Sequence, residues 1–148
     1  MRFKPCRLLS QQQLHSRSGA MPFPLLFHRL LSFGRRSEIQ AIDYLRTLRY
    51  RIVASGYRVK GGEVDVIAWD HDVLVFVEVK ARKNSDPPQD AVGIKKQQRV
   101  IRAARAYMTK HRLHDTPYRF DILAVTAIPG AKPEFVLLHD AFGDSSSL

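Results

Sequence analysis

The sequence has little cysteine and no long hydrophobic run. Its one cysteine, Cys6, cannot form a disulfide within the chain or a cysteine-rich zinc site, and it is compatible with a reducing compartment. No apolar stretch approaches the ~20 residues that a membrane-spanning helix needs. Residues 21–33 are apolar, but two prolines, His28 and Arg29 interrupt them, which is a poor pattern for a signal peptide. We therefore expect a cytoplasmic protein without a membrane segment.

Acidic residues are missing from residues 1–37, which contain seven Lys and Arg. Most of the net charge of +10 lies there, and the other 111 residues carry a net charge of only +3. Three interpretations of residues 1–33 stay open: a flexible basic tail, a start codon placed too early, and an organelle transit peptide. We expect one folded domain over residues 34–142, followed by a short C-terminal tail over residues 143–148.

Hydrophobic periodicity predicts two helices and five strands. Ser37 and Gln40 have the spacing of a capping box, which places the start of the first helix at Ser37, and Gly56 is expected to end the first strand. The expected elements are a helix over 37–49, strands over 50–55, 63–69 and 73–80, a helix over 94–111, and strands over 118–125 and 134–139. Residues 84–90 have the composition of a loop. The order is αβββαβ with one further strand.

The expected hairpin over residues 63–80 carries charged side chains at one end. Alternation along a strand groups side chains by face, and the expected groups are Glu63, Asp65, Ile67 and Trp69 on one strand, and Leu74, Phe76, Glu78 and Lys80 on the next. Two turns remain open. A turn at residues 70–71 places Glu63 opposite Glu78. A turn at residues 71–72 places Asp65 opposite Glu78 and Glu63 opposite Lys80.

Carboxylates that face each other in a sheet destabilise it, so this cluster needs a proton, a cationic partner or a metal ion. Lys80 supplies one positive charge, and a hard divalent cation such as Mg²⁺ can offset the rest through one or two of the carboxylates. Such an ion activates a bound water and stabilises charge on a phosphate, and Lys80 can orient that water or help deprotonate it. The alternative is an exposed strand end with a salt bridge, but the facing pair of acids favours the metal site.

Four segments resemble the YraN-like family of small bacterial proteins of unassigned function. They are GGEVDVIA, LVFVEVKAR, KKQQRVIRAARAYM and YRFDILAV. That family is in turn similar to the PD-(D/E)xK nucleases and the archaeal Holliday-junction resolvases. The resemblance covers residues 34–142 and implies an α/β fold with a restriction-endonuclease-like αβββαβ core, in which helices flank a mixed central sheet.

The resemblance also implies catalytic and metal-binding residues. Asp65 matches the first motif acid, and Glu78 and Lys80 match the E-x-K pair. The implied ligands of Mg²⁺ or Mn²⁺ are Asp65 and Glu78, while Glu63 matches the acid that precedes the motif aspartate in the family. Val64 stands where the nuclease motif has proline, which leaves every implied ligand in place.

Three further positions match the family or depart from it. Glu38 matches a glutamate that opens the first helix, and Gln97 matches the Lys-Gln that opens the second, so both are expected to support the site. His71 stands where the family often has glycine in the hairpin turn, although histidine tolerates a positive φ better than most residues. We read His111, His114 and His139 as surface residues. Asp121 is read as a structural acid at a strand end, with a supporting role behind the site as the alternative.

The helix over 94–111 has a basic face that can contact phosphates. Residues 95–112 contain seven Lys and Arg and no acid, and the residues expected to bind nucleic acid are Lys95, Lys96, Arg99, Arg102 and Arg105. A solvated helix face is the alternative, but such faces usually mix charges of both signs. Lys60, Arg82 and Lys83 flank the acids and extend the same surface.

The sequence therefore predicts a Mg²⁺- or Mn²⁺-dependent endonuclease that acts on branched or otherwise structured DNA. The alternative is a nucleic-acid-binding module on the same fold without turnover. A protein that acts only through its basic tail would leave the acids unexplained. No sequence-reading motif is present, which favours recognition of DNA structure over sequence. A homodimer is implied only for a junction substrate, which needs two symmetric cuts.

Overall fold

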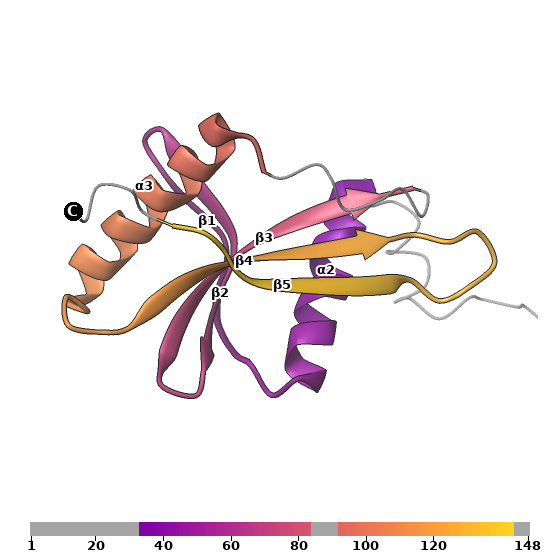
Figure 1. Ribbon diagram of the computed structural model, residues 1–148, viewed down its shortest axis with the longest axis horizontal. Helices are drawn as coiled ribbons and strands as arrows, with labels where there is room; N and C mark the ends of the chain where they lie inside the picture. Colours follow the sequence, from indigo (N-terminus) through magenta and orange to yellow (C-terminus); the bar gives the residue numbers. More distant parts are fainter. Residues whose placement is uncertain (1–32, 84–91, 144–148) are drawn as a thin grey trace, which may run out of the picture. The chain divides into compact units, whose positions relative to one another are not determined.

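The computed structural model describes residues 33–83 and 92–143 of the 148-residue chain (Figure 1). The predicted tails therefore lie outside the described residues, apart from their inner ends, and so do Cys6 and the predicted loop over 84–90. The described residues form the expected elements in the expected order: α2 (Phe33–Thr47), β1 (Arg51–Val59), β2 (Gly62–Asp70), β3 (Val73–Arg82), α3 (Ile94–His111), β4 (Tyr118–Thr126) and β5 (Glu134–Phe142). No helix in this part of the chain is long and apolar enough to cross a membrane.

The strands form a mixed sheet in which neighbours in sequence are neighbours in space. Among the described residues the strand order is β1-β2-β3-β4-β5. Strands β3 and β4 pair in parallel, and the other three pairs are antiparallel. The parallel pair needs a crossover, and α3 lies within it, as is usual for parallel strands. The expected α/β fold with a mixed central sheet and flanking helices is confirmed.

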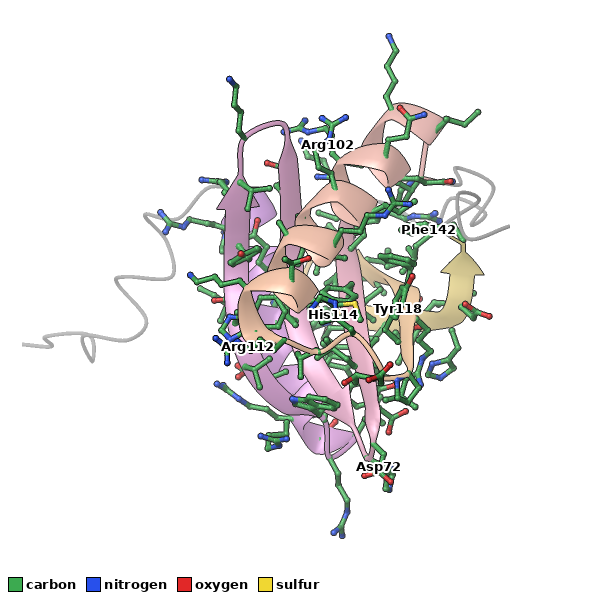
Figure 2. The ribbon with its side chains drawn as sticks, turned by 90° about the vertical axis from the view of Figure 1, so that its left-hand side faces the viewer. Asp72, Arg102, Arg112, His114, Tyr118 and Phe142 are labelled. Carbon is green, nitrogen blue, oxygen red and sulfur yellow. The ribbon has the colours of Figure 1, made fainter. Side chains whose placement is uncertain are left out.

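The two helices cover opposite faces of the sheet. Val100, Ala103 and Ala104 of α3 pack in one buried cluster with Leu74 and Phe76 of β3. Figure 2 shows α3 lying across the strands β1 to β3 on this face. Because side chains alternate along a strand, the intervening valines of β3 point the other way, toward α2. The charged ends of β2 and β3 therefore lie within reach of both helices.

The second cluster lies under α2. It is formed by Ala41 and Leu45 of this helix together with Val75 and Val77 of β3 and further residues of β2 and β4. Burial of this apolar stripe is what fixes the helix on the sheet, since an isolated helix of this length is marginal in water. The first turns of the helix thereby lie near the start of β2 and the end of β3, where the acids are.

Three sequence-based boundaries differ from the structure. Helix α2 begins four residues before Ser37, which is buried inside the helix, so the predicted capping box is wrong. Strand β1 continues through Gly56, which adopts φ of +60° within the strand instead of ending it. Strand β5 extends to Phe142 because that side chain stacks on Phe120 of β4, with ring centroids 5.0 Å apart.

The hairpin between β2 and β3 has the second of the two predicted registers. Asp70 pairs with Val73, so the turn consists of His71 and Asp72. His71 has φ of +52°, the conformation expected of the residue that stands in the glycine position. This register directs Asp65 toward Glu78 at the far end of the hairpin.

Candidate active site where β2 and β3 separate

The pairing of β2 with β3 stops just before the acidic residues. The last paired residues are Val66 and Val77. Beyond them the Asp65 carboxylate takes over the role of a backbone partner, since its Oδ2 accepts a hydrogen bond of 2.8 Å from the Val79 N–H. In Figure 1 the β1–β2 hairpin leans toward α3, whereas the end of β3 continues beside β4. The two strands therefore open a fork with Asp65 and Glu78 on its two arms.

Alternation along β2 breaks at Asp65. Ile67 packs in the cluster under α3, as expected, but Val64 packs in the same cluster although it lies three residues away. The prediction that Glu63 and Asp65 share the face of Ile67 is therefore wrong. Strand β1 breaks alternation in the same region, since Ala54 and Tyr57 both pack against that cluster and Gly56 between them has a positive φ.

A polar cavity of about 240 Å³ lies in the fork. It is lined by Glu38 of α2, Gly56 and Arg58 of β1, Glu63, Val64 and Asp65 of β2, Glu78 and Val79 of β3, and Lys96 of α3. All four carboxylates that the sequence proposed for the site are therefore brought together. They come from three different elements, which is why alternation on one hairpin alone could not place them.

Glu78 is the most buried acid of the cavity, with 6% of the residue exposed. Its Oε1 lies 3.2 Å from the Lys96 ammonium. Its Oε2 is buried and has no hydrogen-bond partner among the described residues. Burial and the neighbouring negative charge of Asp65 raise the pKa of Glu78 from 4.5 to about 7, although Lys96 opposes the shift. A buried carboxylate oxygen without a partner is costly unless a proton or a cation reaches it.

Glu63 is the opposite case, because three cations surround it. Lys96 Nζ lies 2.7 Å from its Oε1, and Arg99 and Arg58 lie 3.1 and 3.8 Å from its Oε2. The hydrogen bond from Lys96 outweighs burial and lowers the pKa of Glu63. For Lys96 itself, burial favours the neutral amine, but the hydrogen bond to Glu63 and the charge of Glu78 raise its pKa. The hydrogen bond to Glu63 therefore keeps the Lys96 ammonium in contact with Glu78.

A glycine allows α3 to bring Lys96 this close. A Cβ at Gly62 would lie 2.8 Å from the Arg99 carbonyl oxygen and 2.9 Å from the Ala103 nitrogen, both in the backbone of α3. Only a residue without a side chain lets the helix rest on the β1–β2 hairpin at this point. At the neighbouring Gly61 the carbonyl accepts a hydrogen bond of 2.9 Å from Arg102. The GGE sequence thus docks the helix and presents Glu63 to it.

Of the other three residues predicted for the site, only Glu38 lines the cavity. Glu38 lines the cavity, and burial and the charge of Asp65 raise its pKa. Gln97 donates a hydrogen bond of 2.6 Å to the Val92 carbonyl, so it supports the start of α3 and not the acids directly. Lys80 is half-buried and pairs with Ala124 of β4, and it is not one of the described residues that line this cavity.

The basic residues of α3 divide into two groups. Lys96 and Arg99 contact the acids, as described above, and Arg102 binds the hairpin at Gly61. Figure 2 shows Arg102, from the middle of α3, beside the β1–β2 turn. Lys95 and Arg105 are exposed. The predicted basic face therefore borders the cavity, but its members Lys96 and Arg99 form part of the cavity's own charge balance.

A second polar cluster lies at the other end of the sheet. Arg119 Nε contacts both oxygens of the fully buried Asp121 at 3.0 and 3.1 Å, and its Nη2 contacts Asp70 at 2.8 Å. Tyr50 and His139 also contact this guanidinium. Asp121 is a structural acid, as predicted, but it sits in the middle of β4 rather than at its end. His139 is exposed, as predicted, and is paired with Asp121.

The residues of the cavity fit a hard divalent cation. Asp65 and Glu78 are two neighbouring carboxylates, and one Glu78 oxygen is buried without a hydrogen-bond partner in the described part of the chain. Among the described residues no group of three or more His, Cys, Asp and Glu side chains is arranged to hold a metal ion. The protein would therefore supply two carboxylate ligands and leave the other positions to water or phosphate oxygens, which is how Mg²⁺ is commonly bound.

Sequence reasoning missed two cations of the cavity. Lys96 was assigned to the phosphate-binding face, because the helical pattern alone does not show how deeply α3 docks on the hairpin. Arg58 was not considered, although a two-residue turn at Lys60 and Gly61 would have placed it opposite Glu63, with which it pairs. The glycines of the turn were the available signal.

The family model and the similar proteins all point to one protein family. The sequence model of the uncharacterised protein family UPF0102 matches residues 37–125. A UPF0102 protein of Geotalea uraniireducens is 42% identical over 113 residues, which are 75% of this chain and 89% of that protein. Another from Geobacter sulfurreducens is 40% identical over 117 residues, 78% of this chain and 91% of that protein. A third, from Syntrophus aciditrophicus, is 42% identical over 115 residues, 76% and 89% of the two chains.

Proposed function

The chain belongs to the uncharacterised family UPF0102, also called the YraN family, as its sequence suggested, and we propose that it is a metal-dependent endonuclease acting on structured or branched DNA. The observation that carries the proposal is the pairing of Asp65 with the buried Glu78 in one polar cavity. Burial and the charge of Asp65 raise the pKa of Glu78, which costs stability, and such arrangements are typical of sites that bind a cation or move a proton. A purely structural role would be served better by neutral side chains.

The proposed reaction is the hydrolysis of a phosphodiester bond. When bound, Mg²⁺ or Mn²⁺ would supply an activated water and offset charge on the phosphate. Asp65 and Glu78 are the residues that would hold the cation. Asp65 is itself oriented by the Val79 N–H, so its carboxylate has a defined direction. Lys80, which follows Glu78 on the same strand, remains the candidate for orienting the attacking water.

The position of the cavity supports a polynucleotide substrate. Arg58 and Arg99 stand at its rim with exposed side chains, and the exposed Lys95 lies on the adjoining turn of α3. Positive side chains beside the acids can bind the phosphates on either side of the scissile one, and such contacts depend strongly on salt. A homodimer belongs to this proposal only if the substrate is a junction that needs two cuts.

The test is cleavage of junction, flap and duplex DNA by the purified protein, with Mg²⁺, with Mn²⁺ and with EDTA. We expect metal-dependent internal cleavage that Glu78→Ala and Asp65→Asn abolish. Glu134→Ala is the matched control, since it removes an exposed glutamate of β5 that does not line the cavity. Cleavage that survives Glu78→Ala comes from a contaminant, and the absence of cleavage on every substrate contradicts the proposal.

A non-catalytic nucleic-acid-binding module is the second candidate. The favouring observation is that Lys96 and Arg99 already pair with the acids, so much of the cavity's charge is balanced without a metal ion. DNA binding with the same affinity in EDTA and in Mg²⁺, without cleavage, would support this candidate.

A further inference from the structure

The Lys96 ammonium lies between two carboxylates of the cavity and supplies a positive charge beside Glu78. Its Nζ lies between Glu63 Oε1 at 2.7 Å and Glu78 Oε1 at 3.2 Å, and its side chain is 29% exposed. The ammonium comes from α3, which docks on the hairpin at Gly62. The docking of α3 therefore places Lys96 beside both acids.

The two acids that hold Lys96 are not equivalent. Glu63 has two further cationic partners, Arg99 and Arg58, so its negative charge is balanced by more than Lys96. For Glu78 the structure describes an ion pair to Lys96 alone, while its second oxygen is buried without a partner. When a cation binds at Glu78, Lys96 can therefore leave Glu78 and remain paired with Glu63.

We propose that Lys96 is a built-in counter-cation that competes with the divalent metal ion for Glu78. This inference rests on the metal site of the proposed function. Without metal, the ammonium lowers the cost of holding Glu78 next to Asp65. When a metal ion binds to Asp65 and Glu78, the ammonium is repelled from Glu78 and stays in the cavity on Glu63, where it can contact a phosphate oxygen of the substrate. The competition lowers the affinity of the site for the metal ion.

The test measures Mn²⁺ binding by calorimetry at fixed pH and salt, so no catalytic activity is needed. Lys96→Met should tighten Mn²⁺ binding by about tenfold or more, because even bulk water does not fully screen a divalent ion from an ammonium a few ångströms away. Lys96→Arg keeps the charge and should leave the affinity close to that of the wild type. Lys95→Met is the matched control, an exposed lysine one residue away, and should change the affinity by less than about twofold.

The outcomes separate this inference from the proposed function. If Asp65→Asn abolishes Mn²⁺ binding but Lys96→Met leaves it unchanged or weaker, the competition is wrong while the metal site stands. If neither the wild type nor Lys96→Met binds Mn²⁺, both fail. A second measurement uses the wild-type protein alone, so it does not depend on the folding of a variant. Addition of Mg²⁺ should shift the NMR signals of the Lys96 ε-methylene, and unchanged signals at saturating Mg²⁺ would overturn the inference.

Discussion

Glu78→Gln should make the metal-free protein more stable, and only above the ordinary pKa of a glutamate. Below pH 4.5, Glu78 is protonated in both the folded and the unfolded chain. Above it the unfolded chain loses the proton first, whereas the folded protein retains it until the pH passes about 7. The stability contributed by this group is therefore present below pH 4.5 and is lost as the pH rises through 7.

The size of this loss follows from the pKa shift. A rise from 4.5 to about 7 corresponds to about 3 kcal/mol at 1.4 kcal/mol per pKa unit. Glutamine has nearly the same shape, its carbonyl can accept from Lys96, and its amide can donate toward Asp65. Relative to the wild type, Glu78→Gln should therefore gain up to about 3 kcal/mol of unfolding free energy at pH 8 and little at pH 4.

The assay is urea unfolding in EDTA, followed by circular dichroism at several pH values between 4 and 8. Glu63→Gln is the matched control with the opposite sign. Lys96 lowers the pKa of Glu63, so this acid contributes stability above pH 4.5 that is lost as the pH falls. A difference between Glu78→Gln and the wild type that does not change with pH, or a less stable Glu78→Gln at pH 8, would refute the reasoning.

Three further predictions concern other parts of the domain. Gly62→Ala should destabilise the protein by about 1–3 kcal/mol, because its Cβ meets the backbone of α3 at 2.8 Å; an unchanged melting temperature would contradict this. Arg119→Met should cost about 3–5 kcal/mol in chemical unfolding, because it leaves the fully buried Asp121 without its guanidinium, whereas a loss below 1 kcal/mol would mean that water replaces the arginine. Lys80→Arg keeps the charge but cannot act as a base, so cleavage should fall while DNA affinity stays constant; cleavage at the wild-type rate would leave no catalytic role for Lys80.

The order of the elements and the identity of the acids could be predicted from the sequence. Alternation and helical periodicity depend on local backbone geometry, so the pattern of apolar residues was enough to place β3 and α3. The turn residues narrowed the hairpin to two registers, and one of them is present. The E-x-K and E-x-D patterns marked Glu78 and Asp65, because acids beside a buried apolar strand need a physical reason.

Tertiary packing decided which cation serves those acids. Lys80 lies next to Glu78 in sequence, yet the cavity holds Lys96 from a helix that follows β3 in the chain. That contact depends on two features that no local pattern encodes: the close approach of α3 over Gly62 and the break in alternation along β2 between Val64 and Ile67. Charge balance in a cavity depends on distances between elements, and those distances are set by the packing of the whole domain.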